Sequence, residues 1–299
     1  MIFVSGTKRS GTSMWMQILR AAGFPVLGKA FPRNWGTNLR DANPDGFYES
    51  LLRDGIYFAT NPHPVTGKYF LPEHVEGYVV KVFVPGVVRS ERAYISQVIA
   101  NVRAWREYEG SIARLYALEA GNRPAPDPDA GDEEPIAPFH FPPALEWWME
   151  NFALVRDISL RKYPARLYAY DQVVEHPEAI IPKVLAWIGS GDVEAAIAAV
   201  KPENRTQVDP GHSDSVEPEL AKVFDDLYAA LREGKGISGA LLATLNQTNV
   251  ALLPRLRELQ LQVVASQRRV AAANRAKAEA QGKRVAGPLG LDGLPDVEF

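Results

Sequence analysis

The sequence contains no cysteine, only five histidines and no long apolar run. The absence of cysteine excludes disulfides and thiolate metal ligands, and it suits a reducing compartment, so we expect a cytoplasmic protein. No apolar stretch approaches the roughly 18 residues of a membrane span. The sequence also does not open with a basic region followed by an apolar core, so we expect neither a span nor a signal peptide. The net charge of −3 provides no general basic field, and we therefore expect no nucleic-acid partner.

What the sequence does contain is an alternation of two apolar patterns. At 299 residues and 46% hydrophobic composition, it can form one domain with insertions, or one domain with an arm. Short apolar runs typical of buried parallel strands alternate with helical patterns. The strand-like runs are residues 2–4, 78–84, 94–102 and 165–171, and the main helical patterns are residues 14–22, 145–161 and 177–188. This alternation predicts an α/β fold in which helices cover both faces of a parallel sheet.

The first strand is followed by a glycine-containing loop and a helix. The loop contains Gly6 and Gly11, and the helical pattern begins at Met14. Loop N–H groups and the positive end of a helix together form a cradle for an anion such as phosphate. The glycines allow the tight backbone angles and the close approach to a ligand that such a cradle needs.

The spacing of the two glycines matches only the first half of a nucleotide triphosphatase P-loop. That motif continues with Lys after the second glycine, whereas here Thr12 and Ser13 follow, and the cations Lys8 and Arg9 precede it. Residues 8–13, Lys-Arg-Ser-Gly-Thr-Ser, resemble the 5′-phosphosulfate loop of the sulfotransferase family. Taken alone, the motif is equally compatible with another anion-binding turn, or with a turn whose basic residues face solvent.

Three further segments resemble that family in the correct order. Residues 43–49 read Asn-Pro-Asp-Gly-Phe-Tyr-Glu, and Lys81 lies in the second strand-like run. Arg103 follows the third run, with Ser111 eight residues later, although the usual Asp-Pro after the Arg is Ala-Trp here. A competing register for this last motif begins at Arg89, but no strand of adequate length directly precedes it.

The resemblance implies a P-loop-type fold and transfer of a sulfuryl group from 3′-phosphoadenosine-5′-phosphosulfate (PAPS) to a hydroxyl or amine of a small-molecule or glycan acceptor, without a metal. It assigns the 3′-phosphate to Arg103 and Ser111, charge stabilisation on the leaving phosphate to Arg9 and Lys81, and the general base to Glu49. The residues it assigns to the 5′-phosphosulfate are Lys8, Arg9, Ser10, Gly11, Thr12 and Ser13.

The sequence leaves rival interpretations open. Glu49 can also be a carboxylate in the first turn of a helix, with His63 as the next residue to consider for the base. Lys81 can also be a strand-end lysine that reaches water. A P-loop kinase-like phosphotransferase and a non-catalytic scaffold that keeps the fold are the alternatives to a sulfotransferase.

The C-terminal part has a different character. After the α/β part (residues 1–236), with its acidic, proline-rich insert at 121–143, residues 237–281 carry an apolar stripe that predicts an amphipathic helical arm. The stripe residues are Leu252, Leu256, Leu259, Val263 and Val270. Pro254 is expected in the first turn of that helix. We expect the arm to dock on its own domain or to form a homo-oligomer, and residues 282–299 to be a flexible tail.

Overall fold

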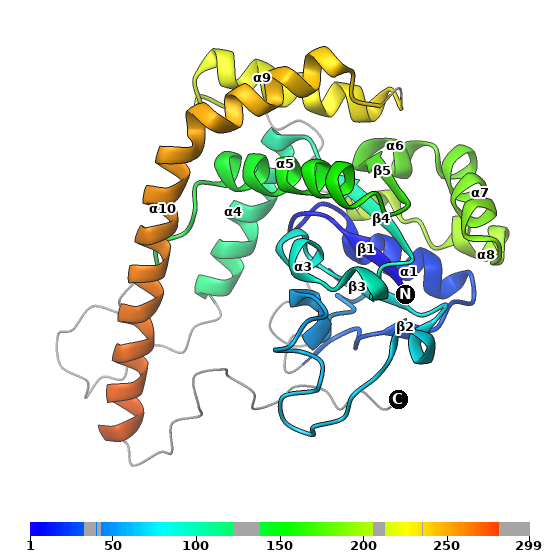
Figure 1. Ribbon diagram of the computed structural model, residues 1–299, viewed down its shortest axis with the longest axis horizontal. Coiled ribbons are helices and arrows are strands. Elements are labelled where there is room, and N and C mark those ends of the chain that lie inside the picture. The colour runs from blue at the N-terminus through cyan, green and yellow to red at the C-terminus, as the bar shows by residue number, and fades with distance from the viewer. Residues whose placement is uncertain (33–39, 41–42, 122–137, 206–212, 235, 281–299) are drawn as a thin grey trace.

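A computed structural model describes residues 1–32, 40, 43–121, 138–205, 213–234 and 236–280 (Figure 1). Five parallel strands form one sheet in the order β2-β3-β1-β4-β5. The strands are β1 (Ile2–Ser5), β2 (Val26–Leu27), β3 (Val79–Lys81), β4 (Gln97–Val102) and β5 (Ala165–Ala169). The described α-helices are α1 (Thr12–Ala21), α3 (Val84–Arg89), α4 (Trp105–Gly121), α5 (Pro143–Arg161), α6 (Tyr170–Glu175), α7 (Pro177–Ile188), α8 (Val193–Ala198), α9 (Pro218–Arg232) and α10 (Gly239–Ala280). Short 3₁₀ turns cover Leu51–Asp54, Pro72–Val75, Arg92–Tyr94 and Pro202–Asn204.

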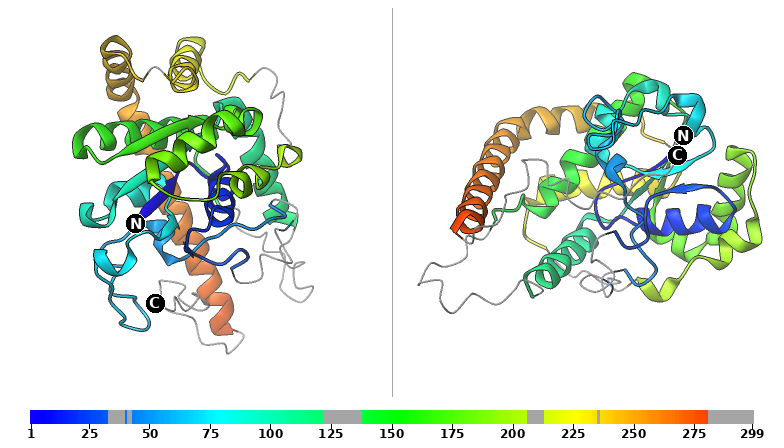
Figure 2. Two further views of the ribbon diagram at one scale, coloured as in Figure 1. Left: turned by 90° about the vertical axis from the view of Figure 1, so that its right-hand side faces the viewer. Right: turned by 90° about the horizontal axis from the view of Figure 1, so that it is seen from below.

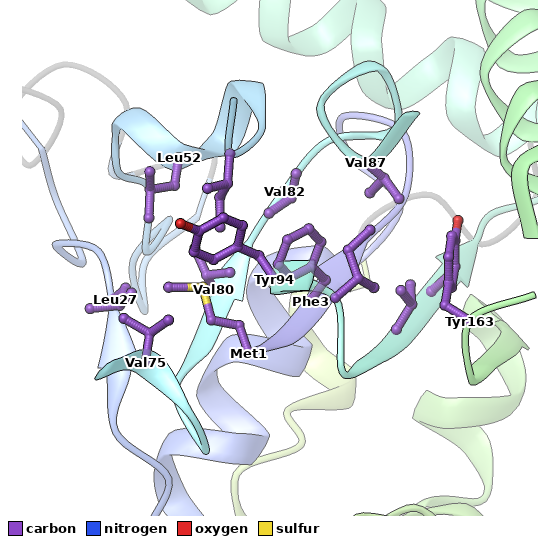
Figure 3. Packing of buried hydrophobic residues seen from close by; sticks show 14 of the residues in the cluster. Met1, Phe3, Leu27, Leu52, Val75, Val80, Val82, Val87, Tyr94 and Tyr163 are labelled. Carbon is purple, nitrogen blue, oxygen red and sulfur yellow. The ribbon is translucent and has the colours of Figure 1, made fainter. Parts of the chain in front are cut away.

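The central strands β1, β3 and β4 are buried on both faces, as the continuous apolar runs predicted, whereas the edge strand β5 is partly exposed. Successive side chains of a strand point to opposite faces. Phe3 therefore packs with Val80 and Val98 on the face covered by α3 and α5 (Figure 3). Its neighbours Ile2 and Val4 pack on the other face, against α1, α7 and α8. The predicted α/β architecture with a parallel sheet and helices on both faces is confirmed.

A second apolar core lies beyond the sheet, among α4, α5, α9 and α10. Trp105, Trp147 and Trp148 surround Phe224 of α9, and the rings of Trp148 and Phe224 stack with centroids 5.2 Å apart. All four side chains are almost completely buried. This cluster attaches the C-terminal helices to the sheet domain.

The helix α10 is the predicted arm, and its apolar stripe lies in or against this second core through Leu252, Leu256, Leu259 and Val263. Val270 is not part of that cluster. The expectation that Pro254 lies in a first turn is wrong, because α10 begins fifteen residues earlier, at Gly239. An interior proline removes a backbone hydrogen bond and bends a helix. Figures 1 and 2 show α10 bending after the stretch that runs beside α9.

Three predicted strands are shorter than the sequence suggested. The run 165–171 ends at Ala169, because Tyr170 already begins α6. The run 78–84 leaves the sheet after Lys81, because Val84 and Pro85 begin α3, and proline favours the first turn of a helix. The run 94–102 enters the sheet at Gln97, after a 3₁₀ turn that buries Tyr94. Most of the predicted insert and the whole predicted tail lie outside the described residues. Within the described part, no helix combines the length and apolar character needed to cross a membrane.

Candidate functional site

A cleft of about 640 Å³ opens at the carboxyl edge of the sheet, where ligand crevices of parallel α/β sheets form. The register places Val4 opposite both Lys81 and Ile99, so the segments after β1, β3 and β4 meet there. The predicted site residues that line the cleft are Lys8, Arg9, Gly11, Thr12, Ser13, Glu49, Lys81 and Arg103. The remaining two, Ser10 and Ser111, are buried and are not among the lining residues.

The glycine loop has the backbone that its sequence predicted. Gly11, the N-cap of α1, has φ 99°, and an added Cβ would lie 2.5 Å from both the Asn101 amide nitrogen and the Tyr170 ring. Arg9 also has a left-handed backbone, with φ 65°. A non-glycine residue in this region carries strain, and such strain is concentrated at ligand-binding sites.

Asn101 holds the loop in place, a role that the sequence reasoning missed. Its amide nitrogen donates to the Ser10 carbonyl at 2.8 Å, and its amide oxygen accepts from the Trp15 indole at 3.2 Å. The Ser10 hydroxyl closes the turn by donating to the Thr7 carbonyl at 2.8 Å. Asn101 is fully buried in β4, and a polar side chain inside an apolar strand is the signal that could have identified it.

Arg9 is a partly buried cation that faces other cations. Its Nε donates to the Ser111 hydroxyl at 3.1 Å. Burial, together with the positive charges of Arg103 and Arg114, lowers the pKa of the Arg9 guanidinium to about 10. Among the described residues, no carboxylate forms an ion pair with Arg9. A bound anion would relieve this repulsion.

Arg103 lies directly after β4 and reaches the same loop. It donates from Nη1 to the Arg9 carbonyl at 3.2 Å and from Nε to Glu107 at 3.1 Å, and its guanidinium lies over the Tyr170 ring, 4.8 Å from the centroid. Arg205 also binds Glu107, at 2.8 Å. Arg205 therefore helps to hold the Glu107 carboxylate that orients Arg103.

The structure brings together the two residues predicted for the 3′-phosphate, because Arg103 and Ser111 both contact Arg9. The other arginines of the two competing registers lie elsewhere. Arg106 pairs with Asp225 of α9 at 2.7 Å, and Arg89 donates to the Pro85 carbonyl on α3.

Lys81 and Glu49 form a buried ion pair at 3.0 Å. The ammonium group also donates to the Ser13 hydroxyl at 3.1 Å and to the Phe47 carbonyl at 3.0 Å, while Arg53 binds the other Glu49 oxygen at 2.6 Å. Burial tends to raise the pKa of Glu49, but Lys81 and Arg53 outweigh it, so that this pKa lies below its usual value. Burial also lowers the pKa of Lys81, although Glu49 opposes this shift.

The turn before Glu49 is held by backbone hydrogen bonds to one segment and by side-chain contacts to another. Glu49 and Lys29 exchange backbone hydrogen bonds across an isolated antiparallel bridge. Asp45, earlier in the turn, binds Lys201 and accepts a hydrogen bond from Asn204 at 2.8 Å. Glu49 precedes the 3₁₀ turn Leu51–Asp54, which is capped by Ser50, and so it is not a first-turn helix carboxylate.

His63, the alternative candidate for the general base, lies outside the cleft, whereas His140 lies in it. The Nδ1 atom of His63 accepts from the Val65 and Thr66 amides within its own loop, and His63 does not line the cleft. His140 does line the cleft, and its ring stacks on that of Tyr116. The described part of the chain holds no group of three or more His, Asp or Glu side chains arranged to bind a metal ion.

An acidic cluster lies where α5 contacts Tyr108 of α4. The Tyr108 hydroxyl donates to Glu146 at 2.6 Å, and Glu150 stands one helical turn after Glu146. Burial and the charge of Glu146 raise the pKa of Glu150 to about 8, against a smaller opposing effect of Lys8. The pKa of Tyr108 is also raised, by burial and by Glu146.

No protein-family model and no curated protein matches the sequence. One similar solved structure is the sulfotransferase domain from the Synechococcus PCC 7002 olefin synthase, with 14% identity and a TM-score of 0.38. That match covers 84% of this chain and 94% of the other.

Proposed function

We propose that this chain is a sulfotransferase that moves a sulfuryl group from PAPS to a hydroxyl or amine acceptor. The observation that carries the proposal is the convergence of Arg9, Arg103 and the glycine loop at the sheet edge, with Arg9 repelled by its cationic neighbours. Two anion-binding groups stand side by side there, and PAPS carries two separate phosphate groups. The order of the motifs along the chain provides independent support.

In this proposal, the N–H groups of residues 9–13 and the Arg9 side chain bind the 5′-phosphosulfate, with Lys8 at the edge of the site. Arg103 and Ser111 bind the 3′-phosphate, where an Arg fork and a hydroxyl are suited to the geometry of the anion. Lys81 and Arg9 stabilise the charge that develops on the leaving 5′-phosphate. Lys81 also orients Ser13 through the hydrogen bond between them.

Transfer is an in-line displacement in which the acceptor oxygen or nitrogen forms a bond to sulfur as the bond from sulfur to the 5′-phosphate oxygen breaks. The acceptor proton passes to Glu49, and the electron pair of the broken bond remains on the phosphate. The low pKa of Glu49 keeps it ionised at neutral pH but makes it a weak base. Proton transfer therefore occurs as the new bond forms and the acceptor proton becomes acidic.

A P-loop phosphotransferase is the main rival. It needs a Lys after Gly11 to reach the transferred phosphate, and Thr12 stands there instead. A scaffold without a reaction would need neither the buried Lys81–Glu49 pair beside the loop nor a strained Arg9 backbone.

Calorimetric titration of the full chain separates these functions. Adenosine 3′,5′-bisphosphate, the desulfonated product, should bind without added metal, whereas ATP with Mg²⁺ should bind much more weakly. The reverse preference would favour the phosphotransferase, and binding of neither nucleotide would favour the scaffold. A turnover assay with PAPS and mixed hydroxyl and amine acceptors then tests the transfer itself.

A further inference from the structure

The arm α10 reaches the cleft as well as the second core. Gln267 lines the cleft, although it lies more than 150 residues beyond the loop and strand ends that form its cationic part. The adjacent Ser266 is 2% exposed, and its hydroxyl accepts from the Phe139 amide at 2.7 Å. The arm therefore fixes the backbone next to His140, another lining residue.

His140 and Tyr116 together form a flat wall of the cleft. Their ring centroids lie 3.9 Å apart at an interplanar angle of 22°, and both residues are among the lining residues. Phe47 and Phe83 line the same cleft. Aromatic faces of this kind prefer planar partners, because rings gain from offset or edge-to-face contact beyond the area that they bury.

The helix α4 sets the distance between this wall and the anion site. Ser111 contacts Arg9, and Tyr116 lies five residues further along the same helix. At a rise of 1.5 Å per residue, this separation is about 7–8 Å along the helix axis. Arg9, Tyr116 and His140 all line the cleft, so one bound compound can contact both the anion site and the ring pair.

We infer that Tyr116, His140 and Gln267 form the acceptor subsite, that its ligand is a planar aromatic compound bearing a hydroxyl, and that the arm α10 completes it. The inference rests on the proposed sulfuryl transfer for its chemistry, but the binding of the aromatic compound is independent of that transfer. The acceptor packs on the outer face of one ring of this stacked pair, and the Gln267 amide binds a polar substituent. The arm is then part of the site, and its docking on α5 and α9 keeps the subsite formed.

The test is direct binding of 2-naphthol to the full chain, in the absence and presence of adenosine 3′,5′-bisphosphate. Binding is measured through the fluorescence of 2-naphthol. Gln267→Ala and His140→Ala should each weaken 2-naphthol about five- to tenfold. Bisphosphate affinity should stay within twofold of the parent value. Gln262→Ala is the matched control, because Gln262 is exposed on the same helix, is bonded to Glu258 and lies outside the cleft, so 2-naphthol affinity should be unchanged.

The outcomes separate the two proposals. Loss of 2-naphthol binding in the cleft variants with intact bisphosphate binding supports the subsite. Equal 2-naphthol affinity of parent, Gln267→Ala and His140→Ala overturns it, as does binding of N-acetylglucosamine in preference to 2-naphthol. A parent chain that binds 2-naphthol through these residues but does not bind the bisphosphate keeps the aromatic subsite and rejects sulfuryl transfer from PAPS.

Discussion

Two cations stand at the ends of the strands that flank β1, and their surroundings differ. Lys81, at the end of β3, is 3% exposed and has three acceptors: a carboxylate, a hydroxyl and a backbone carbonyl. Arg103, after β4, is held by Glu107 and the Arg9 carbonyl while its guanidinium lies across the Tyr170 ring and lines the cleft.

The comparison indicates two different uses of positive charge. The charge of Lys81 is neutralised where it stands, so its removal leaves Glu49 buried beside only one cation. Arg103 and Arg9 share a region with excess positive charge, which is suited to an anion that enters from solvent. We expect changes at the β3 end to affect chemistry and stability, and changes at the β4 end to affect nucleotide affinity.

The largest effect is expected at the β3 end, for Glu49→Gln. The amide retains the size of the side chain but cannot take up the acceptor proton, and its NH₂ group cannot accept from Lys81 or Arg53 as a carboxylate oxygen does, so turnover should fall by about 10² to 10⁴. Bisphosphate affinity should stay near the parent value. The exposed carboxylate variant Glu73→Gln is the control and should retain turnover. Turnover of Glu49→Gln within a few-fold of the parent would remove Glu49 from the role of base.

Lys81→Met should have the next largest effect, on stability. It leaves a buried carboxylate with Arg53 as its remaining ion-pair partner, and the free energy of unfolding should decrease by about 3 kcal/mol in a urea titration. The double variant with Glu49→Gln should recover part of the loss. Lys222→Met removes an exposed partner of Asp226 and should change stability by less than about 0.5 kcal/mol. Equal losses in both lysine variants would contradict the contrast between buried and exposed pairs.

Arg103→Ala tests the other strand end. Loss of the charge-assisted hydrogen bonds from the guanidinium should weaken the binding of adenosine 3′,5′-bisphosphate roughly ten- to a hundredfold, measured by calorimetry. Arg106→Ala, three residues further on and paired with Asp225 outside the cleft, should bind the bisphosphate as the parent does. An unchanged affinity of Arg103→Ala would show that the assignment is wrong, and Arg89 would be the next residue to substitute.

The smallest effect concerns Glu150, a carboxyl group without a cation bonded to it in the described structure. Its folded pKa of about 8 exceeds the ordinary value of 4.5, so the folded state keeps a proton that the unfolded chain loses. Stability should therefore decrease as pH rises from about 5 to 8. Glu150→Gln should reduce this decrease by about 1–2 kcal/mol, measured by urea unfolding at both pH values. Glu219 is exposed, so the control variant Glu219→Gln should leave the pH dependence of the free energy of unfolding unchanged.

Much of the β1 end of the site was predictable, because its determinants are local. The spacing of Gly6 and Gly11 encodes a tight turn between a strand and a helix, and the order of apolar runs encodes a parallel sheet. Arg103 was predicted at the sheet edge because it directly follows an apolar run. The ends of β3, β4 and β5 were misplaced, because the strand preference of Val and Tyr is small and depends on packing, which here places such residues in helices and a buried turn.

The sequence by itself determined that a glycine-containing loop joins the first strand to a helix, and that two cations precede its second glycine. Only the tertiary structure decided which side chains share the cleft. Asn101 supports the loop, Arg53 pairs with Glu49, and Gln267 belongs to a helix that the sequence predicted to dock on its own domain or on a second subunit, without a role in the cleft. These contacts join residues far apart in the chain, and they depend on strand register and helix docking, which arise from the burial of apolar surface across the whole domain.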